Sequence, residues 1–212
     1  LLLEGCSGGG GRFDAGMLYY CPQIWCSDNT DAIERLRIQY GTSFGYPMSS
    51  VSAHVSVCPN HQNHRVTPFK TRGICAMQGT FGYELDLSKM TDEEKKMAGE
   101  QIAFFKEHGR LFQFGDYYRL TSPFENRDYT VWEYAAQDGS EACMSVVYTD
   151  MYANAASEIV KWKGLDPKKV YQMQLDGEDA GNFSGAALMH AGILLPLPEQ
   201  NYDAFQIYLK AE

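Results

Sequence analysis

The feature that most constrains this chain is an alternation of short apolar runs with amphipathic segments over residues 1–109. Four runs are rich in apolar or β-branched residues and are separated by Gly-rich or polar loops: 1–4, 23–26, 50–55 and 80–85. Runs of this kind are typical of strands that are covered on both faces. Because a helix between successive strands makes those strands parallel, the pattern predicts a parallel βα architecture.

The first two helices are predicted from their start signals. Thr30 is a favoured N-cap residue, Asp31 would lie in the first turn, and Gly41 would end the helix. A second helix is expected over 68–77, because Pro68 is a residue type favoured at the first helical position. Both helices follow a predicted strand, as a βα unit requires.

The clearest helix is predicted over 92–108, and the composition changes after it. Thr91 and Glu94 have the spacing of a capping box, and Gly109 supplies a C-terminal stop. Aromatic and β-branched runs then follow, bounded by turn residues, at 129–135, 142–149, 169–175 and 204–210. The sequence therefore predicts two domains, 1–109 with βα units and 110–212 as an antiparallel β-sandwich.

Charge and composition exclude several classes of protein. The chain has 18 basic and 27 acidic residues, a net charge of -9, and no basic run interleaved with aromatic residues, which argues against nucleic acid or an anionic membrane as partner. None of its apolar runs approaches the roughly 18 residues of a membrane-spanning helix. The six cysteines include no C-x-x-C pair, so we expect mostly buried thiols and favour a cytoplasmic location over secretion. The chain opens on an apolar run without an initiator Met, which suggests a fragment.

The loop after the first predicted strand contains Cys6, Ser7 and four successive glycines, Gly8 to Gly11. Without side chains, such a turn allows backbone N–H groups to approach hydroxyl groups of a ligand directly. A plain tight or flexible turn explains a glycine run equally simply. The loop matches neither G-x-G-x-x-G before a helix nor a Walker loop, so phosphate binding is disfavoured.

The loop after the second predicted strand carries Asp28. Its position at a strand end suits a catalytic carboxyl group, but a loop or capping carboxylate would have the same pattern. Trp25 could form the floor of a sugar site by stacking, or belong to the strand core. Arg12 and Arg35 could hold the loops by bonds to carboxylates such as Asp31, or could be solvated surface residues.

Histidine and cysteine residues give only a weak metal signal. Cys58, His61 and His64 are spaced at intervals of three, but they lie in a polar loop, and we expect neither a zinc site nor a cofactor. His54 lies on a predicted strand and is expected to be a core or supporting residue rather than a catalytic base.

Several long motifs resemble the alpha-galactosidases of glycoside hydrolase family 36. The segments that carry the resemblance are CSGGGGRFD at 6–14, QIWCSDNTDAIER at 23–35, YGTSFGYP at 40–47, HVS at 54–56, PNHQ at 59–62 and GTFGYELD at 79–86. The segment SGAALMHAG at 184–192 is similar more loosely. The resemblance therefore covers most of 1–109 and parts of the predicted β domain.

The resemblance implies a fold and site residues. Members of the family have a (β/α)8 TIM barrel followed by an antiparallel β domain, so this chain would contain the last four βα units, the C-terminal half of a barrel. Asp28 occupies the place of the proton donor, the acid/base residue. Cys6, Ser7, Gly8 and Gly9 occupy the place of the turn that contacts galactose, with Trp25 as a further candidate for substrate binding.

The family's nucleophile, the Asp of a Lys-Trp-Asp motif, is absent here, since the only Lys-Trp is followed by Lys163. The resemblance implies hydrolysis of terminal alpha-galactosyl residues, as in melibiose and raffinose, with retention of configuration. The chain would need the N-terminal part of the same enzyme, would be inactive alone, and would be expected in a homo-oligomer that binds a galactose-containing oligosaccharide. The alternatives are a transferring enzyme similar to raffinose or stachyose synthase, and a carbohydrate-binding module without catalysis.

Overall fold

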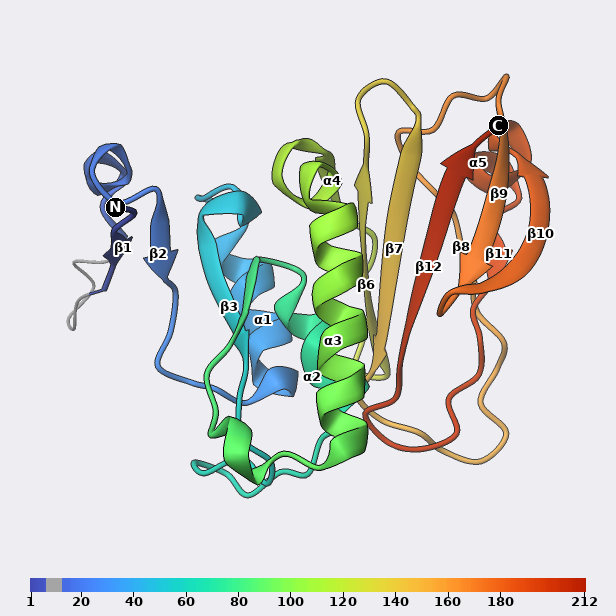
Figure 1. Ribbon diagram of the computed structural model, residues 1–212. Helices are drawn as coiled ribbons and strands as arrows, with labels where there is room; N and C mark the ends of the chain where they lie inside the picture. Colours follow the sequence, from blue (N-terminus) through green and yellow to red (C-terminus); the bar gives the residue numbers. More distant parts are fainter. Residues whose placement is uncertain (7–12) are drawn as a thin grey trace. The chain divides into compact units, whose positions relative to one another are not determined.

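The computed structural model describes residues 1–6 and 13–212, which form two compact units, Leu1–Gln113 and Phe114–Glu212 (Figure 1). The division falls beyond Gly109, where the composition changes, because the chain forms a further short helix there, α4 (Gly109–Phe114). Leu111 and Phe112 of α4 are buried. The Phe112 ring stacks on the Phe105 ring, and the two ring centroids are 5.2 Å apart, a distance typical of aromatic pairs. Gly109 is therefore a junction between two helices rather than the end of helical structure.

The first unit contains the predicted parallel sheet. Its four strands are adjacent in chain order: β1 (Glu4–Gly5), β2 (Gln23–Trp25), β3 (Val51–Val55) and β4 (Thr80–Tyr83). Each neighbouring pair is parallel. Short 3-10 helices in the connections of the described part include η2 (Ala15–Tyr19), η3 (Met48–Ser50) and η4 (Leu87–Lys89). The predicted βα pattern is confirmed for this unit.

The helices α1 (Ala32–Thr42), α2 (Phe69–Ala76) and α3 (Asp92–Glu107) match the three predictions closely. The capping box of α3 is present, with bonds of 3.1 Å in both directions between Thr91 and Glu94. The prediction that Thr30 is the N-cap of α1 is wrong. Asp31 is the N-cap, because its carboxylate accepts a bond from the Glu34 backbone N–H at 3.0 Å.

The two faces of the parallel sheet differ in character. Side chains alternate between the faces of a strand, and Ala53 and Val55 of β3 belong to a buried cluster with Phe69 of α2 and Ala98 of α3. On the alternate positions the strands carry polar or aromatic side chains that line a cavity: Glu4, Gln23, Trp25, Ser52, His54 and Thr80. One face is thus a core for helices, and the other presents groups suited to hydrogen bonding.

The second unit is built from antiparallel sheets. Six strands lie in the order β10-β9-β12-β7-β6-β5, and two more form the sheet β11-β8. Four of them are the predicted strands: β6 (Tyr129–Ala135), β7 (Glu141–Tyr148), β9 (Val170–Leu175) and β12 (Ala204–Ala211). The pattern of the sequence did not predict the other four strands: β5 (Asp116–Arg119), β8 (Ile159–Val160), β10 (Glu178–Ser184) and β11 (Ile193–Leu194). It did not predict the short helix α5 (Gly185–His190) either.

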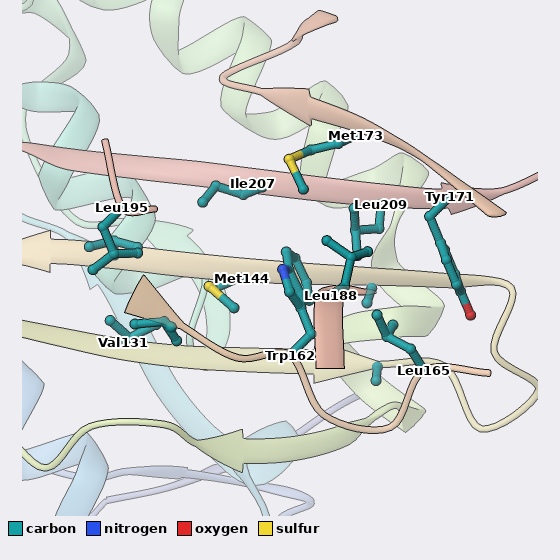
Figure 2. Close-up of a cluster of buried hydrophobic side chains, with 14 of the residues drawn as sticks. Val131, Met144, Trp162, Leu165, Tyr171, Met173, Leu188, Leu195, Ile207 and Leu209 are labelled. Atoms are coloured by element: carbon teal, nitrogen blue, oxygen red, sulfur yellow. The ribbon is translucent and has the colours of Figure 1, made fainter. Parts of the chain in front are cut away.

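A continuous apolar core lies on one face of the six-stranded sheet (Figure 2). Trp162, Leu188 of α5 and Leu195 pack there against strand residues such as Met144 and Leu209, and all of them are at most 2% exposed. The Trp162 of the only Lys-Trp pair is therefore a core residue of the second unit. Sheet residues and the β8–β11 layer share this core, the layered arrangement that the sequence predicts as a sandwich.

Two further observations concern the described residues as a whole. No helix among them is both long enough and apolar enough to cross a bilayer. All six cysteines lie in the described part and none forms a disulfide. Four of the six are buried, as expected: Cys21, Cys26, Cys75 and Cys143.

Candidate functional site

A cavity of about 1090 Å³ is lined by the polar face of the parallel sheet and also by members of the apolar cluster such as Ala53 and Phe69. Residues that follow all four strands reach it: Cys6 after β1, Asp28 after β2, Ser56 after β3 and Glu84 after β4. Ligand sites of parallel sheets form at this edge, because the loops that follow the strands converge there. The cavity is therefore the candidate functional site of the first unit.

Asp28 and Cys6 are both exposed, and both line the cavity. The structure thus brings together the two loops that the sequence analysis singled out, although 22 positions separate these residues in the chain. The other predicted site residues of the glycine turn, Ser7, Gly8 and Gly9, lie outside the described residues.

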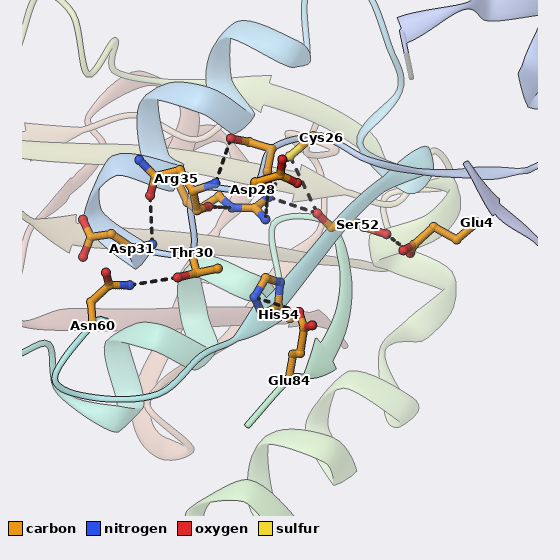
Figure 3. Close-up of polar contacts among 12 residues, drawn as sticks. Glu4, Cys26, Asp28, Thr30, Asp31, Arg35, Ser52, His54, Asn60 and Glu84 are labelled. Atoms are coloured by element: carbon orange, nitrogen blue, oxygen red, sulfur yellow. Dashed lines mark hydrogen bonds and ion pairs between the residues drawn. The ribbon is translucent and has the colours of Figure 1, made fainter. Parts of the chain in front are cut away.

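Arg35 of α1 holds the main chain on both sides of Asp28 (Figure 3). Its Nη2 donates to the carbonyl oxygen of Ser27 at 2.9 Å, and its Nε donates to that of Asn29 at 2.6 Å. The side chain is only 4% exposed, so of the two roles that the sequence left open for Arg35, the structure agrees with a residue that holds the loop and not with a solvated surface arginine. Arg35 can reach these carbonyl groups because α1 begins only three residues after Asn29.

Hydrogen bonds between residues of this loop also stabilise its conformation. The Asn29 amide oxygen accepts a bond from the Asp31 backbone N–H at 3.0 Å, and the Asn29 N–H donates to the Ser27 hydroxyl at 3.1 Å. Asp31, which is 2% exposed, forms an ion pair with Arg65. Asp31 therefore fixes the start of α1 and does not line the cavity, whereas Asp28 does.

Trp25 and His54 form a stacked pair in the cavity wall. Their ring centroids are 4.6 Å apart with an interplanar angle of 19°, and the Arg35 guanidinium lies 5.5 Å from the centroid of the Trp25 ring. Both residues line the cavity, and Trp25 is half-buried. Trp25 thus combines the two roles left open by the sequence, since it faces the cavity and also packs on a neighbouring strand.

His54 is neutral at pH 7. Burial lowers its pKa to about 4, and the positive charge of Arg35 contributes in the same direction. Its Nε2 lies 3.4 Å from the Glu84 carboxylate, but a neutral ring makes no ion pair there. Neither ring nitrogen has a hydrogen-bond partner among the described residues. As expected, His54 is a supporting residue of the wall.

Besides Asp28, four carboxylates among the described residues line the cavity, and the sequence analysis assigned none of them to a site: Glu4, Glu84, Asp86 and Glu94. Glu4 of β1 accepts hydrogen bonds from the Gln23 side-chain amide and the Ser52 hydroxyl, and so connects three adjacent strands across the polar face. Glu84 follows β4 and is exposed. The available signal was an acidic residue at an alternate position of an otherwise apolar strand run.

The residues weighed as zinc ligands do not form one group at the cavity. Cys58 and His61 line it, whereas His64 is not among the lining residues and has a left-handed backbone conformation with φ 62°. Among residues 1–6 and 13–212, no group of three His, Cys, Asp or Glu side chains is arranged to hold a metal ion.

Comparison with known proteins gives consistent matches to both units. The melibiase family model matches residues 1–115, and the model of the glycosyl hydrolase family 36 C-terminal domain matches residues 129–209. The chain is 55% identical over 206 residues to the bifunctional alpha-galactosidase/sucrose kinase AgaSK of Mediterraneibacter gnavus, covering 97% of this chain and 22% of that protein.

Solved structures of family members are also similar. The alpha-galactosidase AgaA of Geobacillus stearothermophilus matches with a TM-score of 0.94 and 50% identity, over 100% of this chain and 29% of that chain. A variant of AgaA in complex with raffinose matches with a TM-score of 0.93 and 48% identity, over the same shares of the two chains.

The matched region is the C-terminal part of these relatives, and the chain spans between a fifth and a third of their length. The melibiase model matches the α/β unit, and the C-terminal domain model matches the β unit. The chain therefore belongs to the melibiase family, the alpha-galactosidases of glycoside hydrolase family 36, and corresponds to the C-terminal part of its members.

Proposed function

We propose that this chain supplies the acid/base half of a retaining alpha-galactosidase site, with Asp28 as the acid/base residue. The observation that carries the proposal is the position of Asp28, an exposed carboxyl group that lines the cavity together with Cys6 at the start of the glycine turn. A proton donor needs this combination of access to the ligand and a fixed main chain.

In the proposed mechanism, protonated Asp28 gives its proton to the glycosidic oxygen as the bond from that oxygen to the anomeric carbon breaks. A second carboxylate attacks the anomeric carbon and forms the covalent galactosyl intermediate. Asp28, now ionised, then takes a proton from water while that water attacks the same carbon and releases galactose. The Asp28 carboxyl is thus returned to its starting state.

The second carboxylate comes from outside residues 1–212 in this proposal. The Lys-Trp-Asp motif is absent from the sequence, and Trp162 of the single Lys-Trp pair is buried in the core of the β unit. We assign the four parallel strands to the wall of a (β/α)8 barrel whose other strands belong to the rest of the enzyme. The polar face of the sheet supports this assignment, because an interior-facing position in a barrel explains side chains such as Glu4 and Ser52 on a parallel strand.

The substrate class in this proposal is an oligosaccharide with a terminal alpha-linked galactose. The relatives' structures in complex with raffinose and with stachyose support it. Turn residues Cys6, Ser7, Gly8 and Gly9 would contact the galactose ring, with Trp25 and His54 in the adjoining wall. The mechanism uses no metal ion or organic cofactor. Assembly of the complete enzyme as a homo-oligomer remains part of the proposal.

The proposal is tested by Asp28→Asn in the complete enzyme. General acid catalysis contributes about 10²- to 10⁴-fold, so kcat/KM for raffinose should fall by that order. An activated aryl galactoside, whose leaving group needs no proton, should keep kcat/KM within about threefold, because this constant reports the step that breaks the glycosidic bond. Asp92→Asn is the matched control, since its side chain is 97% exposed on α3. Unchanged turnover of raffinose in the Asp28→Asn enzyme would refute the assignment.

A further inference from the structure

We infer that Arg35 and Gln62 are positioning residues that set the place of the Asp28 carboxyl group. This inference rests on the proposed role of Asp28. The structure shows that three consecutive carbonyl oxygens, those of Ser27, Asp28 and Asn29, each accept a hydrogen bond from one of these two side chains. The loop that carries the acid is therefore held at every residue from 27 to 29.

Arg35 contacts the two outer carbonyl groups through different nitrogen atoms of one planar group. Nη2 reaches Ser27 and Nε reaches Asn29, while Nη1 donates to the carbonyl oxygen of Ser52 at 3.2 Å. The last bond ties the loop to the neighbouring strand β3. A guanidinium group has this fixed fork of donors, whereas the single ammonium group of lysine does not. The geometry thus requires arginine and not merely a positive charge.

Gln62 contacts the central carbonyl group from a different part of the chain. Its side-chain N–H donates to the Asp28 carbonyl oxygen at 2.9 Å, and its Oε1 accepts from the Thr30 N–H at 2.9 Å. Asn60 orients this loop, since its Oδ1 accepts from the Gln62 N–H at 2.9 Å and its Nδ2 donates to the Thr30 hydroxyl at 3.0 Å. The loops that follow β2 and β3 are therefore locked together around Asp28.

The arrangement has a direct consequence for proton transfer. With three successive carbonyl groups fixed, the Cα–Cβ bond of Asp28 keeps one direction relative to the cavity, and little main-chain motion is left to move the carboxyl group. A displacement of about 1 Å in a reacting group can cost on the order of 10²-fold in rate. Neither Arg35 nor Gln62 needs to touch the substrate to have this effect.

The inference is tested in the complete enzyme with Arg35→Lys and, separately, Gln62→Met. Gln62→Met keeps side-chain length and removes the bonds of the amide group, whereas Arg35→Lys keeps the positive charge but cannot bond to the Ser27, Asn29 and Ser52 carbonyl groups at once. We expect kcat/KM for raffinose to fall by about tenfold or more for Arg35→Lys and by a smaller factor for Gln62→Met, with the activated aryl galactoside reduced by less than about threefold. Arg37→Lys, an exposed position on the same helix, is the matched control. Thermal unfolding of each variant establishes that it is folded at the assay temperature.

A double-mutant cycle then separates positioning from a general structural effect. If Arg35 acts through the Asp28 carboxyl group, adding Arg35→Lys to the Asp28→Asn enzyme should cause no further loss on raffinose. Gln62→Met lies on an exposed loop and provides the same cycle if Arg35→Lys does not fold.

Each result has one interpretation. Equal losses on raffinose and on the aryl galactoside, or a loss that persists undiminished in the Asp28→Asn background, would overturn the positioning role. An Asp28→Asn enzyme with no dependence on the leaving group would instead overturn the proposed function, because that outcome involves neither Arg35 nor Gln62.

Discussion

The two units of this chain bury their strands in different ways. In the first unit, one face of the parallel sheet packs on helices and the other carries Glu4, Ser52 and His54 toward a cavity. In the second unit, one face of the six-stranded sheet is covered by a continuous apolar core around Trp162. Polar groups at interior positions lower stability unless they have partners. Their concentration in the first unit therefore marks the part of the chain whose residues are not explained by packing alone.

Each unit nevertheless contains, on a strand, a histidine or carboxylic acid whose pKa is strongly shifted by burial. Burial lowers the pKa of His54 to about 4 in the first unit and raises the pKa of Glu133 to about 8 in the second. Glu133 on β6 is fully buried, and its carboxyl group accepts bonds from the Lys163 backbone N–H at 3.0 and 3.3 Å. Both groups favour the neutral form near pH 7. Their contributions to the free energy of unfolding nevertheless depend on pH with opposite sign.

The largest expected effect comes from removing the centre of the second core. Trp162→Ala should lower the stability of the β unit by about 3–5 kcal/mol, because a large, fully buried side chain leaves a cavity. Hydrogen exchange at the amides of β6, β7 and β12 measures the loss. The control is Ile159→Ala, a position 62% exposed, with an expected change within about 0.5 kcal/mol. A loss below about 1 kcal/mol for Trp162→Ala would contradict the view of this unit as a packed core.

The pH dependence of stability should have opposite signs in the two units. His54 has a folded pKa of about 4 against an ordinary 6.5, so the unfolded state binds more protons and this group makes stability rise with pH across that window. Glu133 has a folded pKa of about 8 against an ordinary 4.5, so its contribution falls as pH rises across that window. Each slope is at most about 1.4 kcal/mol per pH unit.

Hydrogen exchange of β3 and β6 amides at pH 5 and 6.5, corrected for intrinsic exchange, measures these slopes. Glu133→Gln should remove the falling contribution from β6 and leave the slope of β3 as it was. Persistence of the falling slope in the Glu133→Gln protein would show that another group causes it.

The smallest expected effect tests local helix structure away from the cavity. Thr91→Ala removes half of the capping box of α3 and should cost about 1 kcal/mol, seen as faster exchange in the first turn of α3. Thr91→Ser keeps the hydroxyl group and should cost much less. Equal effects of the two substitutions would mean that the hydroxyl bond to Glu94 contributes little to α3.

Periodicity predicts most of the regular structure, and the errors have physical causes. The strands β6, β7, β9 and β12 were predicted because they are rich in aromatic and β-branched residues. The edge strand β10 (Glu178–Ser184) was missed because it is polar and largely exposed, and edge strands need no apolar pattern. Thr30 and Asp31 are both good caps, but the Thr30 hydroxyl accepts a hydrogen bond from the Asn60 side-chain amide, a tertiary contact, and the Asp31 carboxylate accepts the Glu34 backbone N–H.

The site shows a similar limit. Asp28 could be predicted because it lies at a strand end in a motif, and the resemblance gave it a role. The contacts of Arg35 and Gln62 could not be predicted from the sequence. Their acceptors are backbone carbonyl oxygens, which every residue type has, so no residue pattern indicates them. The sequence offered carboxylates as partners for Arg35, and the structure gives main-chain oxygens.

The short spacing between Asp28 and Arg35, seven positions across the first turn of α1, has a consequence for engineering. A carboxyl group and its main support that lie in one continuous peptide can be transplanted together. A designer who grafts the Asp28 loop onto another parallel sheet should move residues 26–35 as a single cassette and add one amide side chain from the next loop.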